Sequence, residues 1–304
     1  MKVVISEKTS NLDVHGESIR KQVAAKHIDP EHLHRLETDH RAHQKSKDLV
    51  YKLLAQFGIE FQVVHRRQYW PRLDEVDAVI TLGGDGTLLE ASHHIDNESL
   101  PIFGICSSPM SVGYLCTCDY TNLEQAFKQF SQNLLQKVYL RRLRAKVTFC
   151  RTGGEVTTEP SLNDFLFAHE DPAATTRYRI SVGQETEMHK SSGIWVATAA
   201  GSSAAIQAAG GEVFHMTFEQ FQFKVRELYA PPGKNKGRLH SGLFDAEKKH
   251  LIIENLCTKA ILAIDGYHDK VVLSFGDKIS FVPATNLAVF HFDEEQATTT
   301  VKKC

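Results

Sequence analysis

Residues 79–87, Val-Ile-Thr-Leu-Gly-Gly-Asp-Gly-Thr, constrain the fold of this chain more than any other segment. The apolar run at residues 76–82 is typical of a buried strand, and Leu88, Leu89 and Ala91 indicate that a helix follows the glycines. Glycine lets a backbone approach a ligand closely, and the free N–H groups at a helix start favour an anion. The segment therefore predicts a strand, a phosphate-binding turn and a helix.

Asp85 is unexpected in such a turn, because its charge would repel a phosphate. An acid there is explained if it binds a metal ion or takes a proton from an attacking hydroxyl group. The alternative is an ordinary Asp-Gly turn, but three glycines directly after a buried strand favour phosphate binding. The P-loop and dinucleotide-binding glycine motifs are both absent from the sequence. The candidate phosphate ligands are therefore Gly83, Gly84, Gly86 and Thr87.

Strand and helix patterns alternate in the first part of the chain. Apolar runs at residues 3–5 and 102–106 and the alternating apolar residues at 59–63 indicate strands. The spacing at residues 43–57, ended by Gly58, indicates a helix. Thr121 and Glu124 form a capping-box pattern before another amphipathic stretch. We expect residues 1–137 to form an α/β domain whose mainly parallel sheet is covered on both faces.

The pattern changes after Val138. Short strand candidates separated by Gly, Asp, Asn or Pro follow one another at residues 144–151, 165–169, 178–182, 194–198, 261–264, 271–275 and 279–282. This spacing predicts a second, β-rich domain over residues 138–304.

The composition excludes several classes of protein. A formal net charge of −2 and a sequence pI near 6.8 give no support for a nucleic-acid-binding surface. The weakly polar stretch at residues 194–211 consists mostly of Ala, Ser and Gly, so we expect no membrane span. The cysteines are scattered and no secretory pattern precedes Lys8, which leads us to expect reduced thiols and a cytoplasmic location.

A second group of candidate residues lies in the β-rich part. The pair Asn163-Asp164 either caps a turn or offers an amide and a carboxylate to ribose hydroxyls or an adenine edge. Residues 197–205 are small and include Thr198, Gly201, Ser202 and Ser203. Such residues serve either close helix–strand packing or a flat ring lying against the backbone, and the residues alone do not decide between the two.

Other polar residues have simpler explanations. Asp265-Gly266 between two β-rich runs is typical of a hairpin turn. Lys224 and Arg226 belong to an amphipathic stretch, where a solvated face is the expected role and phosphate binding the alternative.

Taken in order, these segments resemble the NAD kinase family. The family's Gly-Gly-Asp-Gly-Thr is intact at residues 83–87, its Asn-Glu motif corresponds to Asn163-Asp164, and its Thr-Gly-Ser-Thr-Ala segment corresponds to residues 200–204. The resemblance extends from about Val76 to Phe292. It is strongest with the branch that contains plant NADH kinase and animal mitochondrial NAD kinase. The chain differs from the commoner bacterial pattern at Asp164, Ser192 and Ala205, where that pattern has Glu, Asp and Tyr.

The resemblance implies an N-terminal Rossmann-like α/β domain and a C-terminal β-sandwich-type domain. It also implies transfer of the ATP γ-phosphoryl group to the adenosine-ribose 2′-hydroxyl of NAD or NADH, with Mg²⁺ or another divalent cation accompanying ATP. Such enzymes are usually dimers or tetramers, and we expect a homodimer or a tetramer with no nucleic-acid or membrane partner.

The resemblance also suggests a role for each candidate residue. Asp85 would be the base and a metal-side acid, and Arg226 would join residues 83–87 in binding phosphate. The residues that would bind the dinucleotide are Asn163, Asp164, Thr198, Gly201, Ser202 and Ser203.

Two alternative functions and one substrate preference follow from the same residues. Lipid and sphingoid-base kinases share Gly-Gly-Asp-Gly-Thr, but a basic amphipathic helix or an apolar entry is not evident in the sequence. A catalytically inactive nucleotide-binding regulator would have no need for Asp85. Because Ser192 replaces an aspartate, we expect NADH to be accepted at least as readily as NAD⁺.

Overall fold

The structure is a computed structural model that describes residues 1–65, 69–230, 237–248, 250–266 and 268–292. The chain divides into two compact units. The first, the α/β unit, comprises Met1–Val138 together with Ala288–Cys304, and the second, the β unit, comprises Tyr139–Leu287. The expected fold class, α/β followed by a largely β part, is confirmed.

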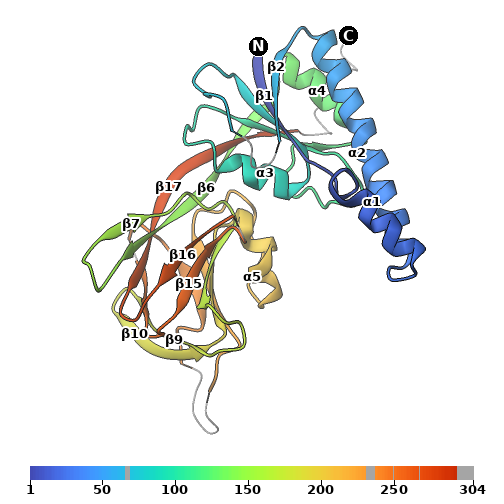
Figure 1. Ribbon diagram of the computed structural model, residues 1–304. Coiled ribbons are helices and arrows are strands. Elements are labelled where there is room, and N and C mark those ends of the chain that lie inside the picture. Colours follow the sequence, from blue (N-terminus) through green and yellow to red (C-terminus); the bar gives the residue numbers. More distant parts are fainter. Residues whose placement is uncertain (66–68, 231–236, 249, 267, 293–304) are drawn as a thin grey trace. The chain divides into compact units, whose positions relative to one another are not determined.

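The α/β unit is built on a parallel sheet (Figure 1). Its strands β1 (Lys2–Glu7), β2 (Glu60–His65), β3 (Ala78–Gly83) and β4 (Ile102–Cys106) pair in the order β2-β1-β3-β4. The short strand β5 (Cys118–Asp119) runs parallel to β4. Burial on both faces explains why β1, β3 and β4 read as almost continuous apolar runs, whereas β2 at the edge of the sheet is more exposed.

Helices cover both faces of this sheet. Apolar side chains of α2 (Pro30–Gln56) and α4 (Leu123–Ser131) share one buried cluster with Ile5, Ile80 and Phe103. Gly104 points to the other face, where a Cβ atom on it would lie 2.9 Å from Leu88 of α3 (Asp85–Ser92). The helix α1 (Asn11–Ala24) packs against α2.

Two details of the helices differ from the sequence-based expectations. The helix expected at residues 43–57 begins much earlier, at Pro30, where Asp29 caps it by accepting a bond from the Glu31 amide at 2.9 Å. The capping box expected at Thr121 is wrong. Asn122 occupies the N-cap position of α4 without a side-chain cap, and the Thr121 hydroxyl donates to Asp119 instead, at 2.5 Å.

The β unit contains two antiparallel sheets. The first has the order β13-β12-β11-β8-β15-β16, with β8 (Asp164–His169), β11 (Gly193–Ala197), β12 (Phe221–Arg226), β13 (Ser241–Phe244), β15 (Ala260–Ile264) and β16 (Asp269–Leu273). The second has the order β10-β9-β14-β17, with β9 (Thr176–Val182), β10 (Glu185–Ser191), β14 (Leu251–Asn255) and β17 (Lys278–His291). It is the antiparallel part of one 11-stranded sheet, because the far end of β17 pairs with β4 of the parallel strands. In addition β6 (Gln136–Thr148) pairs with β17 and with β7 (Glu155–Thr157).

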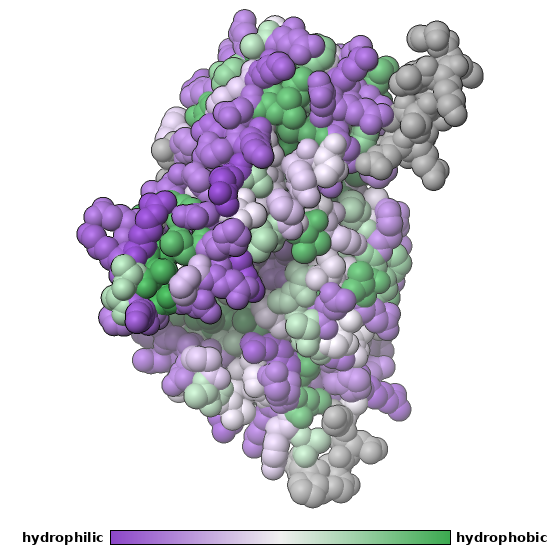
Figure 2. Space-filling model, turned by 90° about the vertical axis from the view of Figure 1, so that its right-hand side faces the viewer, coloured by the Kyte–Doolittle hydropathy of each residue, from purple (hydrophilic) through white to green (hydrophobic). Residues whose placement is uncertain are grey.

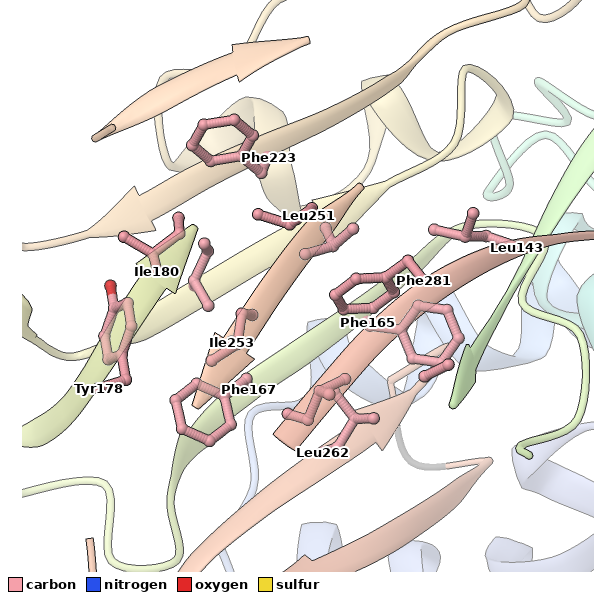
Figure 3. Close-up of a cluster of buried hydrophobic side chains, with 14 of the residues drawn as sticks. Leu143, Phe165, Phe167, Tyr178, Ile180, Phe223, Leu251, Ile253, Leu262 and Phe281 are labelled. Carbon is pink, nitrogen blue, oxygen red and sulfur yellow. The ribbon is translucent and has the colours of Figure 1, made fainter. Parts of the chain in front are cut away.

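Side chains from both sheets form one core (Figure 3). Phe165 and Phe167 of β8 and Leu262 of β15 lie in the same cluster as Ile253 of β14 and Phe281 of β17. The rings of Phe165 and Phe281 meet edge to face, with centroids 5.4 Å apart. This shared core makes the unit a β-sandwich type, as expected.

Candidate active site

The glycine turn at residues 83–87, named here the phosphate turn, joins β3 to α3. Gly83 ends the strand, Gly84 is the N-cap, and the helix begins at Asp85. A Cβ atom on Gly83 would lie 2.1 Å from Thr87 Oγ1, and one on Gly84 would lie 2.7 Å from Ser111 Oγ, so neither position has room for a side chain. A Cβ atom on Gly86 would meet nothing within 4 Å. Packing within the protein therefore explains why Gly83 and Gly84 have no side chain. At Gly86 the missing side chain leaves open space beside the backbone.

Two backbone amides hold the Asp85 carboxylate. The N–H of Tyr114 donates to Oδ2 at 3.0 Å, and the N–H of Leu115 donates to Oδ1 at 2.7 Å. Asp85 is also the first residue of α3, where the helix dipole favours a negative charge. These interactions offset the charge that would otherwise repel a phosphate, and they fix the orientation of the carboxylate.

A cavity of about 430 Å³ opens beside the phosphate turn. It is lined by Gly84, Asp85, Gly86 and Thr87 together with residues of the β1–α1 connection and of α3, among them Lys8 and Glu90. The Lys8 ammonium lies 2.8 Å from the Asp39 carboxylate. The cavity thus combines backbone N–H groups, carboxylates and a cation, which is a suitable set for a phosphate chain that carries a divalent ion.

Sequence reasoning missed Lys8, although the signal was present. Lys8 directly follows β1, which runs parallel to β3, and its N–H donates to the Leu82 carbonyl at 2.9 Å. The carboxyl ends of parallel strands meet at one edge of a sheet, so the residue after β1 lies beside the turn after β3.

Buried polar groups support the β1 side of this cavity. Glu7 is 4% exposed and accepts bonds from Lys47 Nζ at 2.5 Å and from Tyr51 Oη at 2.6 Å. His43 shares a 2.8 Å bond with Ser107 Oγ. Burial, and then the charge of Lys8, lowers the pKa of His43, so the imidazole is neutral at physiological pH.

Residues 161–164, named here the 161–164 loop, lead into β8 and carry the Asn163-Asp164 pair. Asp265 binds this loop from the turn between β15 and β16, where the expected hairpin is confirmed. The main chain of Asp265 has a φ of 45°, a left-handed conformation that Asp adopts more readily than most residues.

Asp164 is the first residue of β8 and only 4% exposed. Burial, and then the nearby charge of Asp265, raises the pKa of Asp164 to about 7. Near neutral pH its carboxyl group is therefore present in both protonation states, and it can donate or accept a hydrogen bond.

Thr198 and Gly201 pack directly against the 161–164 loop. The Thr198 N–H donates to the Asn163 carbonyl at 2.9 Å, and the Thr198 hydroxyl donates to the Leu162 carbonyl. A Cβ atom on Gly201 would lie 2.1 Å from the Asn163 carbonyl oxygen. Close packing therefore accounts for this glycine, whichever ligand the neighbouring residues bind.

The two serines after Gly201 differ in their surroundings. Ser202 is fully buried, and its hydroxyl donates to the Ala199 carbonyl at 2.6 Å and accepts from the Phe214 N–H at 2.9 Å. Ser203 is half-buried. Residues 200–203 form a 3₁₀ turn, and the helix α5 (Ala205–Ala208) that follows is a single turn.

Arg226 does not lie beside the Asn163-Asp164 pair. It pairs with Gly193 at one end of β11, whereas Asp164 pairs with Ala197 at the other end. Four residue steps along a strand span about 13 Å. The Arg226 guanidinium lies over the Trp195 ring, 5.7 Å from its centroid, and Nε is 3.8 Å from the Glu227 carboxylate.

Within the described residues, no helix is long and apolar enough to cross a membrane. The same part of the chain contains no group of three or more His, Cys, Asp or Glu residues that could hold a metal ion.

Comparison with known proteins identifies the family of this chain. Residues 12–135 match the family model described as "ATP-NAD kinase N-terminal domain". A "Probable NADH kinase" of Oryza sativa subsp. japonica is 30% identical over 272 residues, which cover 82% of this chain and 81% of that protein. The "NADH kinase" of Arabidopsis thaliana is 29% identical over 302 residues, covering 86% and 88% respectively.

Solved structures share the fold. An NAD kinase from Archaeoglobus fulgidus in complex with ATP has a TM-score of 0.66 at 18% identity, covering 100% of this chain and 98% of that chain. Yeast NADH kinase complexed with NADH has a TM-score of 0.68 at 15% identity, covering 99% and 86%. The fold, the intact phosphate turn and the rice relative agree, and the chain belongs to the NAD kinase family.

Proposed function

We propose that this protein transfers the γ-phosphoryl group of ATP to the 2′-hydroxyl of the adenosine ribose of NAD or NADH. ATP-dependent phosphorylation of NAD(H) to NADP(H) is the activity that its family membership supports. The observation that carries the proposal is the Asp85 carboxylate at the start of α3, held by two backbone amides beside an open phosphate turn.

The proposed reaction is a direct displacement at phosphorus. Asp85 takes the proton of the 2′-hydroxyl as its oxygen forms a bond to the γ-phosphorus, and the bond from that phosphorus to the β–γ bridging oxygen breaks to release ADP. Backbone N–H groups of Gly86 and Thr87 would bind the phosphates. The Lys8 charge would offset part of the negative charge that develops on them.

The acceptor adenosine would be held by residues of the β unit. Asn163 offers an amide, Asp164 a carboxyl group that can donate or accept, and Ser203 a half-buried hydroxyl. Thr198, Gly201 and Ser202 would contribute by fixing the backbone next to the 161–164 loop, since their polar atoms already bond to neighbouring protein groups. Arg226 would have no part in this subsite, because it lies at the far end of β11.

A divalent ion, Mg²⁺ in the first instance, would accompany ATP. Asp85 and Glu90 supply carboxylate oxygens on the same cavity, and hard cations such as Mg²⁺ are usually bound by one or two carboxylates plus the substrate phosphates. The ion would neutralise charge on the β- and γ-phosphates. Loss of turnover in excess chelator, with recovery on adding Mg²⁺, tests this requirement.

The lipid-kinase alternative is less well supported. On the face shown in Figure 2, apolar residues form separate groups among hydrophilic ones, whereas a lipid entry would need a continuous apolar surface. The deciding experiment offers NAD⁺, NADH and a sphingoid base in turn to the purified protein with Mg-ATP. Formation of NADP(H) without lipid phosphate supports the proposal, lipid phosphate alone contradicts it, and no turnover with any acceptor supports an inactive regulator.

The proposed assembly is a homodimer or a tetramer. The support is the resemblance to the NAD kinase family, whose members usually assemble through the β domain. Light scattering on the purified protein at several concentrations tests the assembly, and a mass equal to that of one chain at all of them would contradict it.

A further inference from the structure

One buried carboxylate organises the whole 161–164 loop. Asp265 is 7% exposed, and its Oδ1 atom accepts bonds from Ser161 Oγ at 2.7 Å, the Asn163 N–H at 2.9 Å and the Asp164 N–H at 3.0 Å. Its Oδ2 atom accepts a further bond from the Leu162 N–H at 3.0 Å. Each residue of the loop therefore donates one hydrogen bond to the same side chain.

The connection runs in both directions. The Asp265 N–H donates to the Asp164 carbonyl at 2.9 Å, which ties the hairpin turn to the start of β8. Hydrogen bonds to a charged group are stronger than neutral ones, and leaving a buried N–H without a partner is costly. The backbone of the loop is thus fixed by a residue that lies about a hundred positions away in the sequence.

The loop also contains an unused polar atom. The Asn163 amide oxygen is buried and has no hydrogen-bond partner among the described residues. Buried polar atoms without partners are rare in native proteins and are often completed by a ligand or by water. This atom, on the residue that precedes Asp164, marks the place at which a polar ligand would complete the loop.

We infer that Asp265 is a positioning residue for the dinucleotide, because its carboxylate holds the 161–164 loop in the conformation that presents Asn163 and Asp164 to the acceptor adenosine. The inference rests on the proposed function, in which these two residues bind that acceptor. The donor phosphates would bind at the phosphate turn, where Asp85 is held by separate bonds to Tyr114 and Leu115. Loss of the Asp265 charge should therefore affect binding of the dinucleotide far more than binding of ATP.

Asp265→Asn tests this inference with little change in shape. One amide oxygen can remain at the Oδ1 position, but the NH₂ group then faces the Leu162 N–H, donor against donor, and the negative charge is lost. We expect the KM for NADH or NAD⁺ to rise at least about tenfold, as the loss of one to two hydrogen bonds implies. The KM for ATP should change by less than about twofold.

Asp277→Asn is the matched control. Asp277 is a buried turn aspartate of the same unit, 2% exposed, and it accepts bonds from the Cys150 N–H at 2.8 Å and the Ser274 N–H at 2.7 Å. Ser274 follows the end of β16 that pairs with Ala260, whereas Asp265 follows Ile264 at the other end of that hairpin. We expect this variant to unfold at a lower temperature but to keep both KM values within about twofold of the wild type.

Ser161→Ala covers the case in which Asp265→Asn does not fold. It removes a single bond to Asp265 and should raise the dinucleotide KM about two- to tenfold, with the KM for ATP unchanged. Equal rises in both KM values, or an unchanged dinucleotide KM in whichever of the two variants is folded, would overturn the inference. A wild-type protein that makes no NADP(H) would instead refute the proposed function, so the two failures can be told apart.

Discussion

At the scale of single residues, Asp85 resolves an apparent contradiction. A carboxylate beside a phosphate site costs electrostatic energy, but two backbone amides and the start of α3 offset its charge. The remaining reason for an acid at this position is chemistry, as a base or as a ligand of the divalent ion.

Asp85→Asn should therefore lower kcat while leaving the fold intact. Asparagine has almost the same shape but cannot take the proton of the acceptor hydroxyl, and loss of a positioned general base typically costs about 10²–10⁴-fold. Steady-state kcat, measured beside the circular dichroism spectrum and the melting temperature, checks this. A folded variant that turns over within a few-fold of the wild type would show that Asp85 is not the base.

The raised pKa of Asp164 predicts a pH-dependent stability. Burial first, and the Asp265 charge second, raises the pKa from 3.8 when the chain is unfolded to about 7 when it is folded. The folded state then binds the proton more tightly, so this contribution is fully present below pH 4 and is lost as the pH rises through 7. The protonation of Asp164 contributes at most about 4 kcal/mol to the free energy of unfolding.

Asp164→Asn removes this titration. We expect the difference in unfolding free energy between the variant and the wild type to move in favour of the variant from about pH 5 to about pH 8. Urea unfolding at the two pH values gives this difference. If it is the same at both, the carboxyl group of Asp164 does not titrate in this range.

The residues of the site were only partly predictable from the sequence. The phosphate turn at Gly83–Thr87 was predictable because the glycines and the buried strand before them are neighbours in the sequence. The Asn163-Asp164 pair was predictable for the same reason. The partners of Asp85 lie about thirty positions away, and those of Asp265 about a hundred. No local pattern reveals such contacts, so the residues alone indicated no more than a hairpin turn at Asp265, and Lys8 was missed.

At the scale of elements, two glycines are needed for different reasons. Gly201 packs against the protein backbone, and Gly86 leaves space for a ligand. A Cβ atom on Gly201 would lie 2.1 Å from the Asn163 carbonyl, whereas one on Gly86 would meet nothing within 4 Å.

Gly201→Ala should push the 3₁₀ turn away from β8, which costs about 1–3 kcal/mol of stability and weakens dinucleotide binding. Gly86→Ala should leave stability within about 0.5 kcal/mol but raise the KM for ATP, since the methyl group enters the cavity beside the phosphate turn.

Chemical denaturation and steady-state kinetics on the two variants check these outcomes. Gly201→Ala with wild-type stability would mean that the backbone there adjusts freely. Gly86→Ala with wild-type kinetics would mean that no substrate group approaches this residue.

The elements themselves followed from the sequence where one periodicity dominated. β1, β3, β4, β8, β9, β11 and β15 were expected within a few residues of their observed bounds. The helix α1 and the first half of α2 were missed because their polar sequences carry a weak apolar stripe, and their starts depend on the caps Ser10 and Asp29. β10 is largely exposed and β13 is short and only partly buried, so their sequences lack the apolar alternation of a buried strand.

At the scale of the whole molecule, the chain leaves the α/β unit near Val138 and returns to it at Ala288. The sequence indicated the change of pattern near Val138. It gave no sign of the return, because only residues 279–282 were expected as a strand, whereas β17 extends to His291 and its two ends belong to different units. Its Val289 pairs with Ile102 of β4 in the parallel sheet.

The preference between NAD⁺ and NADH is a property of the full dinucleotide site. Ser192 adjoins β11 at the end opposite Thr198, and the six residue steps between them span about 20 Å along the strand. This separation suits the span between the two ends of a dinucleotide. Glu227 lines the same hollow as Ser192, but its carboxylate is paired with Arg226 at 3.8 Å.

We therefore predict that NADH is used at least as well as NAD⁺, and that Ser192→Asp shifts kcat/KM towards NAD⁺. An added carboxylate favours the positively charged nicotinamide ring by ~1–2 kcal/mol at partly screened distances, and each 1.4 kcal/mol corresponds to about tenfold in preference. The ratio of kcat/KM for the two acceptors, in both proteins, checks this. A strong wild-type preference for NAD⁺, or no shift in the variant, would contradict it.

Phosphoryl transfer to the 2′-hydroxyl of NAD(H) can be observed in the product itself. The measurement is the ³¹P NMR spectrum of NADH incubated with Mg-ATP and the purified protein. We expect a new phosphomonoester resonance that coincides with the 2′-phosphate of added NADPH and grows in equal amount with ADP. ADP formed without this resonance, or a phosphate at another position of the dinucleotide, would contradict it.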